Sequence, residues 1–237
     1  MFLTFLGVNG PYPGKSGACS GYLLTSDSGK TNIAIDLGSG CLGRLMQELD
    51  GDISKLDALI LSHLHYDHMS DTLPLQYALD FSSVAALKTF APETPAANRK
   101  LLSGKLDVYP MQDTVIGDMK IEFTAVKHPV ETYAVKVICD GATFVYTGDS
   151  NVCDILPIFC DKCDLLLADC GLSEEDWAPN KPHLSPVKCG ELANDSRAKC
   201  LWLTHLSPRY EAEDLLNACL LVFPNTELAQ AGLRIRV

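Results

Sequence analysis

The chain has 237 residues and a formal net charge of −11, with 47 % hydrophobic and 21 % charged residues. This composition is typical of a globular protein and excludes an intrinsically disordered chain. The acidic excess disfavours a large nucleic acid as partner, because such partners are held by clusters of Lys and Arg. A small anionic substrate stays compatible with it, since bound divalent cations would reverse the local field.

Strand-like and helix-like patterns alternate along the chain. In the first half we expect strands at Phe2–Val8, Gly21–Thr25, Asn32–Asp36 and Leu56–Leu61. Helices are expected there at Cys41–Leu49, Leu73–Phe81 and Pro95–Leu102. In the second half the expected strands are Lys120–Val126, Tyr133–Cys139, Thr143–Thr147, Leu165–Ala168 and Cys200–Thr204. The helices there are expected at Val152–Phe159, Pro186–Asp195 and Glu211–Val222.

Both halves thus follow the same order, strands first and then helix–strand units. There is no repeat of fixed period and no low-complexity linker in the sequence. We therefore expect one α/β domain over residues 1–237, in which two sheets pack face to face with helices outside.

The N-terminus and the cysteines bear on the compartment. The segment from Met1 to Val8 has no basic leader and is read as a strand, and no apolar run approaches the ~18 residues of a membrane span. Ten cysteines suit a reduced protein that uses them as small buried hydrophobes. We expect a soluble, cytoplasmic protein with no membrane partner. An alternative use is a structural zinc site at Cys160-x-x-Cys163 with Cys153 or Cys170, although a second paired module is lacking.

The chemical signal of this sequence lies in its histidines. There are six, at positions His63, His65, His68, His128, His183 and His205. Each follows a strand-like run or lies in a Gly/Pro/Ser-rich turn, where binding residues tend to sit. Any one of them alone would more often be an ordinary surface or core residue. That interpretation weakens here because no histidine is left over, and three of them gather with Asp67 directly after a predicted strand.

The spacing of this cluster suits metal binding. His63 and His65 are two residues apart, so in an extended segment they point to the same side and can converge on one ion. Asp67 and His68, past the turn, can bind a neighbouring ion. Imidazole and carboxylate ligands suit zinc, with manganese or iron as alternatives. The cluster supplies at most two ligands per ion, so other loops must contribute.

Three later residues can complete the ligand set, and each follows a predicted strand. They are His128, Asp149 and His205. Gly148 permits a sharp turn before Asp149. A carboxylate has two oxygens, so Asp149 is the natural bridge between two cations.

The pattern His63-x-His65-x-Asp67-His68, followed by His128, Asp149 and His205, resembles the metallo-β-lactamase superfamily across nearly the whole chain. The resemblance implies an αββα sandwich of two mixed sheets flanked by helices, with two divalent metal ions at one edge. It assigns to the first ion His63, His65, His128 and Asp149. It assigns to the second ion Asp67, His68, Asp149 and His205. It also implies that Asp36 supports the metal loop without binding metal; a simple strand-terminal cap is the alternative.

Two further motifs resemble the ribonuclease Z-like phosphodiesterase branch of that superfamily. Thr204-His205-Leu206-Ser207-Pro208-Arg209-Tyr210 is similar to the motif around the last metal-ligand histidine. His183, within Pro182-His183-Leu184-Ser185-Pro186, occupies the place of a catalytic histidine that binds no metal, and Asp169 that of the acid that orients it. A cationic His183 could bind a phosphate oxygen or protonate the leaving alkoxide. A plain surface-loop histidine is the alternative.

The resemblance implies a hydrolase in which a hydroxide bridging two cations attacks phosphorus. Asp67 would orient the water or accept its proton, and His183 would assist departure of the leaving group. The chain departs from transfer-RNA processing enzymes, which hold their substrate with a long basic arm. Between Asp149 and Asp169, Lys162 is the sole basic residue. We therefore expect a small anionic ester as substrate, in particular a nucleotide or cyclic nucleotide.

Several alternatives stay open. The loop from Gly7 to Gly17 is either a plain Gly/Pro connection or a substrate-facing rim with Lys15 near the anion. The same dinuclear site could hydrolyse a thioester, lactone or sulfate ester, or act as an endoribonuclease on transfer-RNA 3′ ends. A non-enzymatic metal-binding role is a third interpretation. Ribonuclease Z-like proteins are often dimers, so the resemblance also implies a homodimer.

Overall fold

The computed structural model describes residues 1–15 and 17–237, and the strands of these residues form two seven-stranded sheets. In spatial order the first sheet contains β14 (Arg234–Arg236), β1 (Phe2–Gly7), β2 (Gly21–Thr25), β3 (Asn32–Leu37), β4 (Ala58–Ile60), β5 (Leu87–Phe90) and β6 (Leu106–Tyr109). The second contains β13 (Thr226–Leu228), β12 (Leu201–Thr204), β11 (Leu165–Asp169), β10 (Ala142–Tyr146), β9 (Tyr133–Cys139), β8 (Met119–Ala125) and β7 (Thr114–Ile116).

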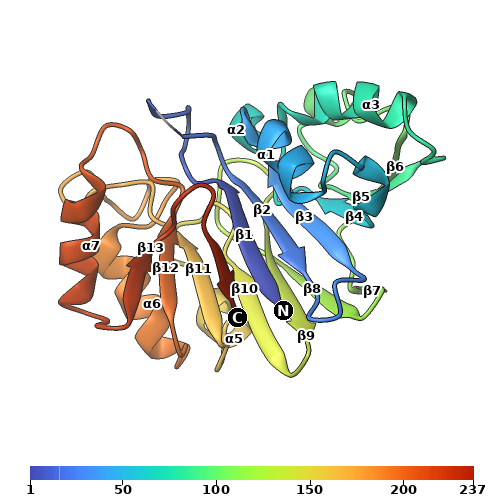
Figure 1. Ribbon diagram of the computed structural model, residues 1–237. Coiled ribbons are helices and arrows are strands. Elements are labelled where there is room, and N and C mark those ends of the chain that lie inside the picture. Colours follow the sequence, from blue (N-terminus) through green and yellow to red (C-terminus); the bar gives the residue numbers. More distant parts are fainter. Residues whose placement is uncertain (16) are drawn as a thin grey trace.

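Helices cover the outer faces of the sheets. They are α1 (Cys41–Glu48), the 3₁₀ turn η1 (Ile53–Lys55), α2 (Tyr66–Met69), α3 (Thr72–Asp80), α4 (Ala96–Arg99), α5 (Ile155–Phe159), α6 (Pro186–Asp195) and α7 (Ala212–Leu220). Figure 1 shows α1 and α3 on one side of the molecule and α6 and α7 on the other, with the strands between them. In the described part of the chain, no helix is both long and apolar enough to cross a membrane.

The alternation of side chains along each strand builds the layers. In β3, Ile33 and Ile35 lie in the core between the two sheets, whereas Ala34 faces the core under the helices of the first sheet. In β10, Phe144 lies in the core between the sheets, and Val145 packs toward α5, α6 and α7. Successive strand residues point to opposite faces, so strands buried on both sides are apolar throughout. The αββα sandwich is confirmed.

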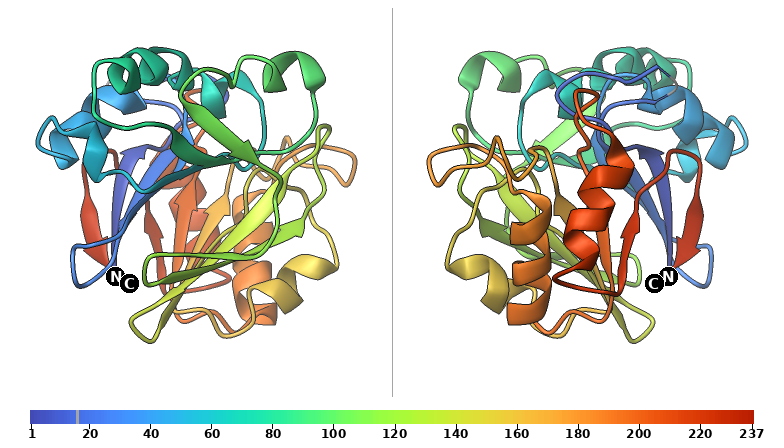
Figure 2. Two further views of the ribbon diagram at one scale, coloured as in Figure 1. Left: turned by 90° about the vertical axis from the view of Figure 1, so that its right-hand side faces the viewer. Right: turned by 90° about the vertical axis from the view of Figure 1, so that its left-hand side faces the viewer.

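The parallel strands of both sheets direct their carboxyl ends to one edge. β3, β4, β5 and β6 run parallel in the first sheet, and β10, β11, β12 and β13 run parallel in the second. Ligands of such sheets bind beyond the carboxyl ends of the strands. In Figure 1 α2, which follows β4, lies at the top, and both termini lie at the bottom; Figure 2 shows the two termini next to each other.

The predicted elements are present, with corrections at their ends and at the sheet edges. The helix expected at Pro95–Leu102 is only Ala96–Arg99, and the one expected from Val152 begins at Ile155. Five strands have no counterpart in the sequence-based expectation: β5, β6, β7, β13 and β14. They are three or four residues long, and all except β7 contain a charged residue, as in Arg234–Arg236, so their apolar alternation is too short to recognise.

Candidate metal centre

The first group of metal-binding side chains comes from two loops. His63 and His65 follow β4, and His128 follows β8. The Nδ1 of His65 lies 3.0 Å from Nε2 of His63 and 3.2 Å from Nε2 of His128. Burial lowers the pKa of all three, most for His63, where the neighbouring His68 adds to it. The three imidazoles are therefore neutral and their ring nitrogens face one another. A neutral imidazole is the form that binds a cation.

The second group consists of Asp67 and His68 of α2, Asp149 after β10, and His205 after β12. Asp149 Oδ2 lies 3.3 Å from His68 Nε2, and its Oδ1 lies 3.3 Å from His205 Nδ1. Asp149 Oδ2 is also 3.6 Å from His63 Nε2, so this carboxylate reaches both groups. Burial would raise the pKa of Asp149, but His205, His68 and His63 hold it well below its ordinary value.

Two orphaned atoms show that these residues fit divalent cations. His68 Nε2 and Asp149 Oδ1 are buried and have no hydrogen-bond partner among the described residues. Buried polar atoms without a partner are rare and costly. Both atoms belong to the second group, whose ligand atoms lie within 4.8 Å of one another. A cation there would satisfy both, and the nitrogen and oxygen donors suit zinc, manganese or iron.

The structure therefore brings all seven predicted ligands together, in two groups that meet at Asp149. The arrangement agrees with the two predicted ligand sets. The role of each residue as a ligand stays a prediction.

Asp36 holds the metal loop from behind. It is fully buried and accepts hydrogen bonds from Ser62 N at 2.7 Å, Ser62 Oγ at 2.8 Å, His68 Nδ1 at 2.8 Å and Tyr146 Oη at 3.2 Å. Because Nδ1 of His68 is engaged, its Nε2 is left to face Asp149. Asp36 has φ +56°, a left-handed conformation that is uncommon for residues other than glycine. These bonds go beyond those of a strand-terminal cap.

His183 and Asp169 form a pair at the edge of the cluster. Asp169 ends β11, and its Oδ2 lies 2.9 Å from His183 Nδ1. Burial would lower the pKa of His183, but the charge and hydrogen bond of Asp169, with a contribution from Asp149, raise it to about 9. The imidazole is thus held as a cation, with Nδ1 engaged. A third group of potential ligands joins Asp149, Asp169, His183 and His205, and within it Nδ1 of His183 is already hydrogen-bonded to Asp169.

A cavity of about 160 Å³ opens onto the cluster. It is lined by Pro11, His65, Asp67, His128, Pro129, Asp149, Pro182, His183 and His205. The N-terminal loop contributes Pro11, and an added Cβ on the preceding Gly10 would lie 2.0 Å from the His205 ring, so only glycine fits there. The loop is therefore more than a plain connection.

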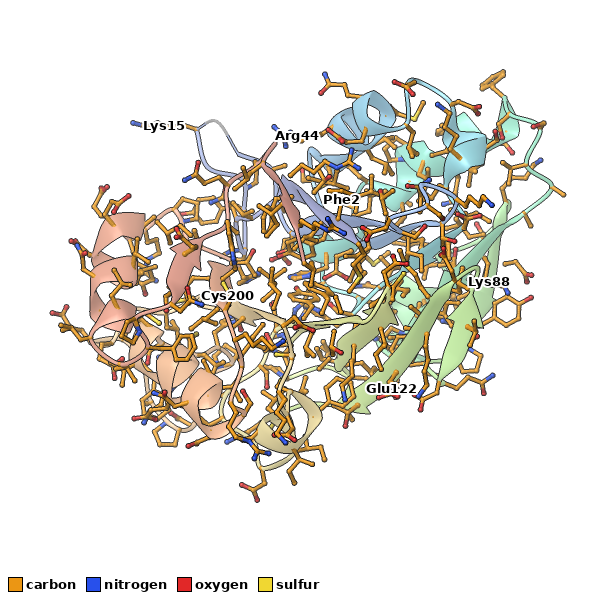
Figure 3. The ribbon with its side chains drawn as sticks, turned by 60° about the horizontal axis from the view of Figure 1, so that its bottom comes forward. Phe2, Lys15, Arg44, Lys88, Glu122 and Cys200 are labelled. Carbon is orange, nitrogen blue, oxygen red and sulfur yellow. The ribbon has the colours of Figure 1, made fainter. Side chains whose placement is uncertain are left out.

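Lys15 is not placed as a substrate-facing residue of this cavity. It lines a separate hollow of about 660 Å³, together with Asn9 and Tyr210. Figure 3 shows Lys15 at the tip of the loop, pointing away from the body of the molecule. The loop approaches the cluster through Gly10 and Pro11 and then turns outward. Ser16 lies outside the described residues.

Cys160 and Cys163 are buried in the core between the second sheet and its helices. Burial raises the pKa of the Cys163 thiol to about 12, as expected for an inert core cysteine. None of the three groups of potential metal ligands among the described residues contains a cysteine. The cysteines act as small apolar side chains, and the structural-zinc alternative gains no support.

Three residues that support the cluster were not found from the sequence. Ser20 Oγ lies 3.1 Å from His205 Nδ1, Asn98 Nδ2 donates to the carbonyl of Leu64 at 2.6 Å, and Tyr146 bonds Asp36. Ser20 is separated from His205 by 185 positions. Only Tyr146 had a local signal, because it precedes Asp149 closely in the sequence.

A cluster of imidazoles and carboxylates at the edge of an αββα sandwich defines the class of metallo-hydrolases. The family description "Beta-lactamase superfamily domain" matches residues 31–206. The chain belongs to the β-lactamase superfamily and, within the metallo-β-lactamase fold, to its ribonuclease Z-like branch. It is an enzyme of the metallo-hydrolase type.

Three known proteins are similar to this chain in sequence or structure. The chain is 31 % identical over 226 residues to the probable metallo-hydrolase YhfI of Bacillus subtilis (strain 168), covering 91 % of each chain. The crystal structure of YhfI matches with a TM-score of 0.91 and 29 % identity over 99 % of both chains. Ribonuclease Z of Methanopyrus kandleri is 26 % identical over 279 residues, covering 100 % of this chain and 98 % of that protein. A diphosphatase from the PhnP family shares the fold with a TM-score of 0.78, 19 % identity and coverage of 100 % and 97 %.

Proposed function

We propose that the protein is a phosphodiesterase that hydrolyses a small phosphodiester, such as a nucleotide or a cyclic nucleotide. The observation that carries this proposal is the His183–Asp169 pair, which holds a cationic imidazole beside the two ligand groups. A phosphodiester gains negative charge toward its transition state and releases an alkoxide, so it benefits from such a group. The relatives named ribonuclease Z and diphosphatase support a phosphate ester as substrate.

The residues divide the work as follows. Two divalent cations, with zinc the expected ion and manganese or iron as alternatives, would be held by the seven predicted ligands. When bound, they would supply Lewis acidity that acidifies water and offsets charge on phosphate oxygens. Asp67 lines the cavity, and its Oδ2 lies 3.5 Å from His68 Nε2. In this proposal Asp67 orients the attacking water and accepts its proton.

The reaction balances with these groups. The oxygen of water forms a new bond to phosphorus, and its proton passes to Asp67 and then to solvent. The bond between phosphorus and the leaving oxygen breaks, and His183 gives a proton from Nε2 to that oxygen. Asp169 keeps Nδ1 of His183 engaged and stabilises the cation before transfer. The products are a phosphomonoester and an alcohol, and His183 regains its proton from solvent.

The size of the site favours a small substrate. The cavity of about 160 Å³ suits a single phosphodiester group, with the rest of the molecule outside. Between Asp149 and Asp169 the described chain contains only the five-residue helix α5, which offers no basic arm for a folded RNA. The net charge of −11 supports the same conclusion.

The proposal is tested with metal-loaded protein and four esters: a cyclic nucleotide, bis-p-nitrophenyl phosphate, an acyl thioester and an aryl sulfate. We expect hydrolysis of both phosphodiesters. His183→Ala should lower turnover of the cyclic nucleotide, whose alkoxide needs a proton, by ~10²–10⁴-fold, the usual contribution of a general acid, without loss of bound metal. Activity confined to the thioester and indifferent to His183→Ala would overturn it. Asn194→Ala, an exposed change on α6, serves as a control.

The similarity to a full-length ribonuclease Z favours one further candidate, the endoribonuclease that processes transfer-RNA 3′ ends. It is tested by incubation of the metal-loaded enzyme with a precursor transfer RNA, beside a cyclic nucleotide. Cleavage of the precursor at low enzyme concentration, with no turnover of the nucleotide, would favour this candidate. Lactone and sulfate-ester hydrolysis remain alternatives for the same site.

Two properties outside the site stay predictions. The ten cysteines are all free, which supports a reducing, cytoplasmic location. A homodimer is the assembly that the family resemblance implies, and sedimentation analysis of the purified protein would test it.

A further inference from the structure

The segment that carries His183 has little regular structure of its own. Residues 172–184, here called the strap, connect β11 to α6 and contain neither helix nor strand, and the structure describes all of them. The middle of the strap is exposed at Glu174, Glu175 and Asp176. Leu184, at the end of the strap, is buried in the core between the second sheet and its helices. The rest of the strap, including His183, is held by hydrogen bonds to neighbouring segments.

Asn151 makes three of these bonds, more than any other residue. It is fully buried, two residues after Asp149. Its Nδ2 donates to the carbonyl oxygens of Ala178 at 2.9 Å and Lys181 at 2.6 Å, and its Oδ1 accepts from Trp177 Nε1 at 3.0 Å. One side chain therefore contacts the strap at three points, the last of them two residues before His183.

The backbone around Asn151 joins the same network. Its own amide donates to the carbonyl of Lys127, next to His128, at 3.0 Å. The amide of Ser150 donates to Asp169 Oδ2 at 3.0 Å, the oxygen that also holds His183. The turn after β10 thus connects the His128 loop, the Asp169 carboxylate and the strap.

The other ties to the strap differ from Asn151 in burial or in role. Lys127 Nζ donates to the carbonyl of Pro179, and Tyr210 Oη donates to Asp176, both at exposed positions. His128 Nδ1 lies 3.2 Å from the carbonyl of Pro182, but His128 is itself a predicted ligand. Exposed bonds compete with water and hold less firmly than buried ones.

We propose that Asn151 is a positioning residue that fixes the strap so that His183 delivers its proton to the leaving oxygen. This inference rests on the proposed phosphodiesterase function. Asn151 is not among the residues that line the cavity. Its removal leaves Asp169 and all predicted ligands in place but withdraws two donors and one acceptor from the strap.

The test compares Asn151→Ala with His183→Ala and with the exposed control Asn194→Ala, which loses a bond to Val222 in the same way. Three quantities are measured: bound metal, hydrogen exchange of peptides covering 172–184, and turnover of two phosphodiesters. One ester releases p-nitrophenolate, which leaves without a proton, and the other is a cyclic nucleotide, whose alkoxide needs one. Trp177→Phe removes one of the three contacts and provides a milder variant if Asn151→Ala does not fold.

We expect Asn151→Ala to keep its metal, to speed exchange in the strap at least about tenfold and to lower cyclic-nucleotide turnover at least ~30-fold. Turnover of the aryl ester should fall less than about threefold, since a good leaving group needs no general acid. If Asn151 had a purely structural role, its loss would lower the turnover of both esters by a similar factor. Trp177→Phe should also lower cyclic-nucleotide turnover more than aryl-ester turnover, but by a smaller factor.

The outcomes separate this inference from the proposed function. Unchanged exchange in the strap, or an equal loss on both esters, overturns the role of Asn151. If His183→Ala itself leaves alkyl-ester turnover intact, the proposed function fails instead. If His183→Ala is impaired and Asn151→Ala is not, the function stands and the positioning role falls.

Discussion

The two halves of the molecule supply the centre in different ways. The first sheet delivers four of the predicted ligands on one short segment, His63 to His68, directly after β4 and within α2. The second sheet delivers His128, Asp149 and His205 on three separate loops. In the first half, the local path of the chain sets the distances between ligands. In the second half, strand register and bonds between loops must set them.

This difference implies that the two halves respond differently to substitution. The segment His63–His68 is supported from behind by Asp36 and at its middle by Asn98. The loops of the second half depend on each other, since Asp169 contacts both Ser150 and His183. Changes in the second half should therefore spread further through the site.

The largest effect is expected for Asp149→Ala, because this residue of the second half touches histidines of both groups. Turnover should fall by more than the ~100-fold typical for loss of a residue that only supports a ligand. Metal analysis should show loss of ions from both groups. Asp154→Ala, at an exposed site nearby, is the control. Retention of two ions per chain would contradict the bridging role.

Asp169→Asn should rank second. The amide cannot stabilise a cationic His183, so turnover of an alkyl phosphodiester should fall roughly 100-fold with bound metal unchanged. Kinetics and metal analysis on the same sample separate the two effects. Loss of metal would instead place Asp169 among the ligands, as the third group of side chains allows.

Removal of metal by a chelator should lower thermal stability. A bound ion would satisfy His68 Nε2 and Asp149 Oδ1, which have no hydrogen-bond partner within residues 1–15 and 17–237. A ligand at 100 times its Kd stabilises a fold by ~2.7 kcal/mol. For a chain of this size that corresponds to about 5–10 °C in Tm. Calorimetry of the protein before chelation, after it and after reloading with zinc would measure the change. Identical Tm values would argue against a buried ion.

The smallest effect is expected for Asn98→Ala in the first half. This change removes the bond to Leu64, between His63 and His65, and should weaken metal binding about tenfold. Competition with a chromophoric chelator would give the affinity. A loss as large as that of Asp149→Ala would show that the first half also depends on long-range support, and the contrast between the halves would disappear.

Sequence reasoning could reach the ligand residues because their signals are local. His63 to His68 form one motif, and Asp149 and His205 each follow an apolar strand. The supporting contacts could not be found this way. Ser20 reaches His205, and Asn98 reaches Leu64, only because the folded sheets bring distant segments together. Lys15 illustrates the reverse case, since a charged residue in a promising loop points away from the cavity.

The bond between Tyr146 and Asp36 has a consequence for evolution and engineering of this chain. It crosses from the second sheet to the first, directly behind His68, at 3.2 Å. The geometry of the metal centre therefore depends on how the two sheets pack against each other. A small shift of one sheet against the other changes the distances between ligands of the same ion. Substitutions deep in the core between the sheets, far from any ligand, should change the metal affinity before they unfold the protein.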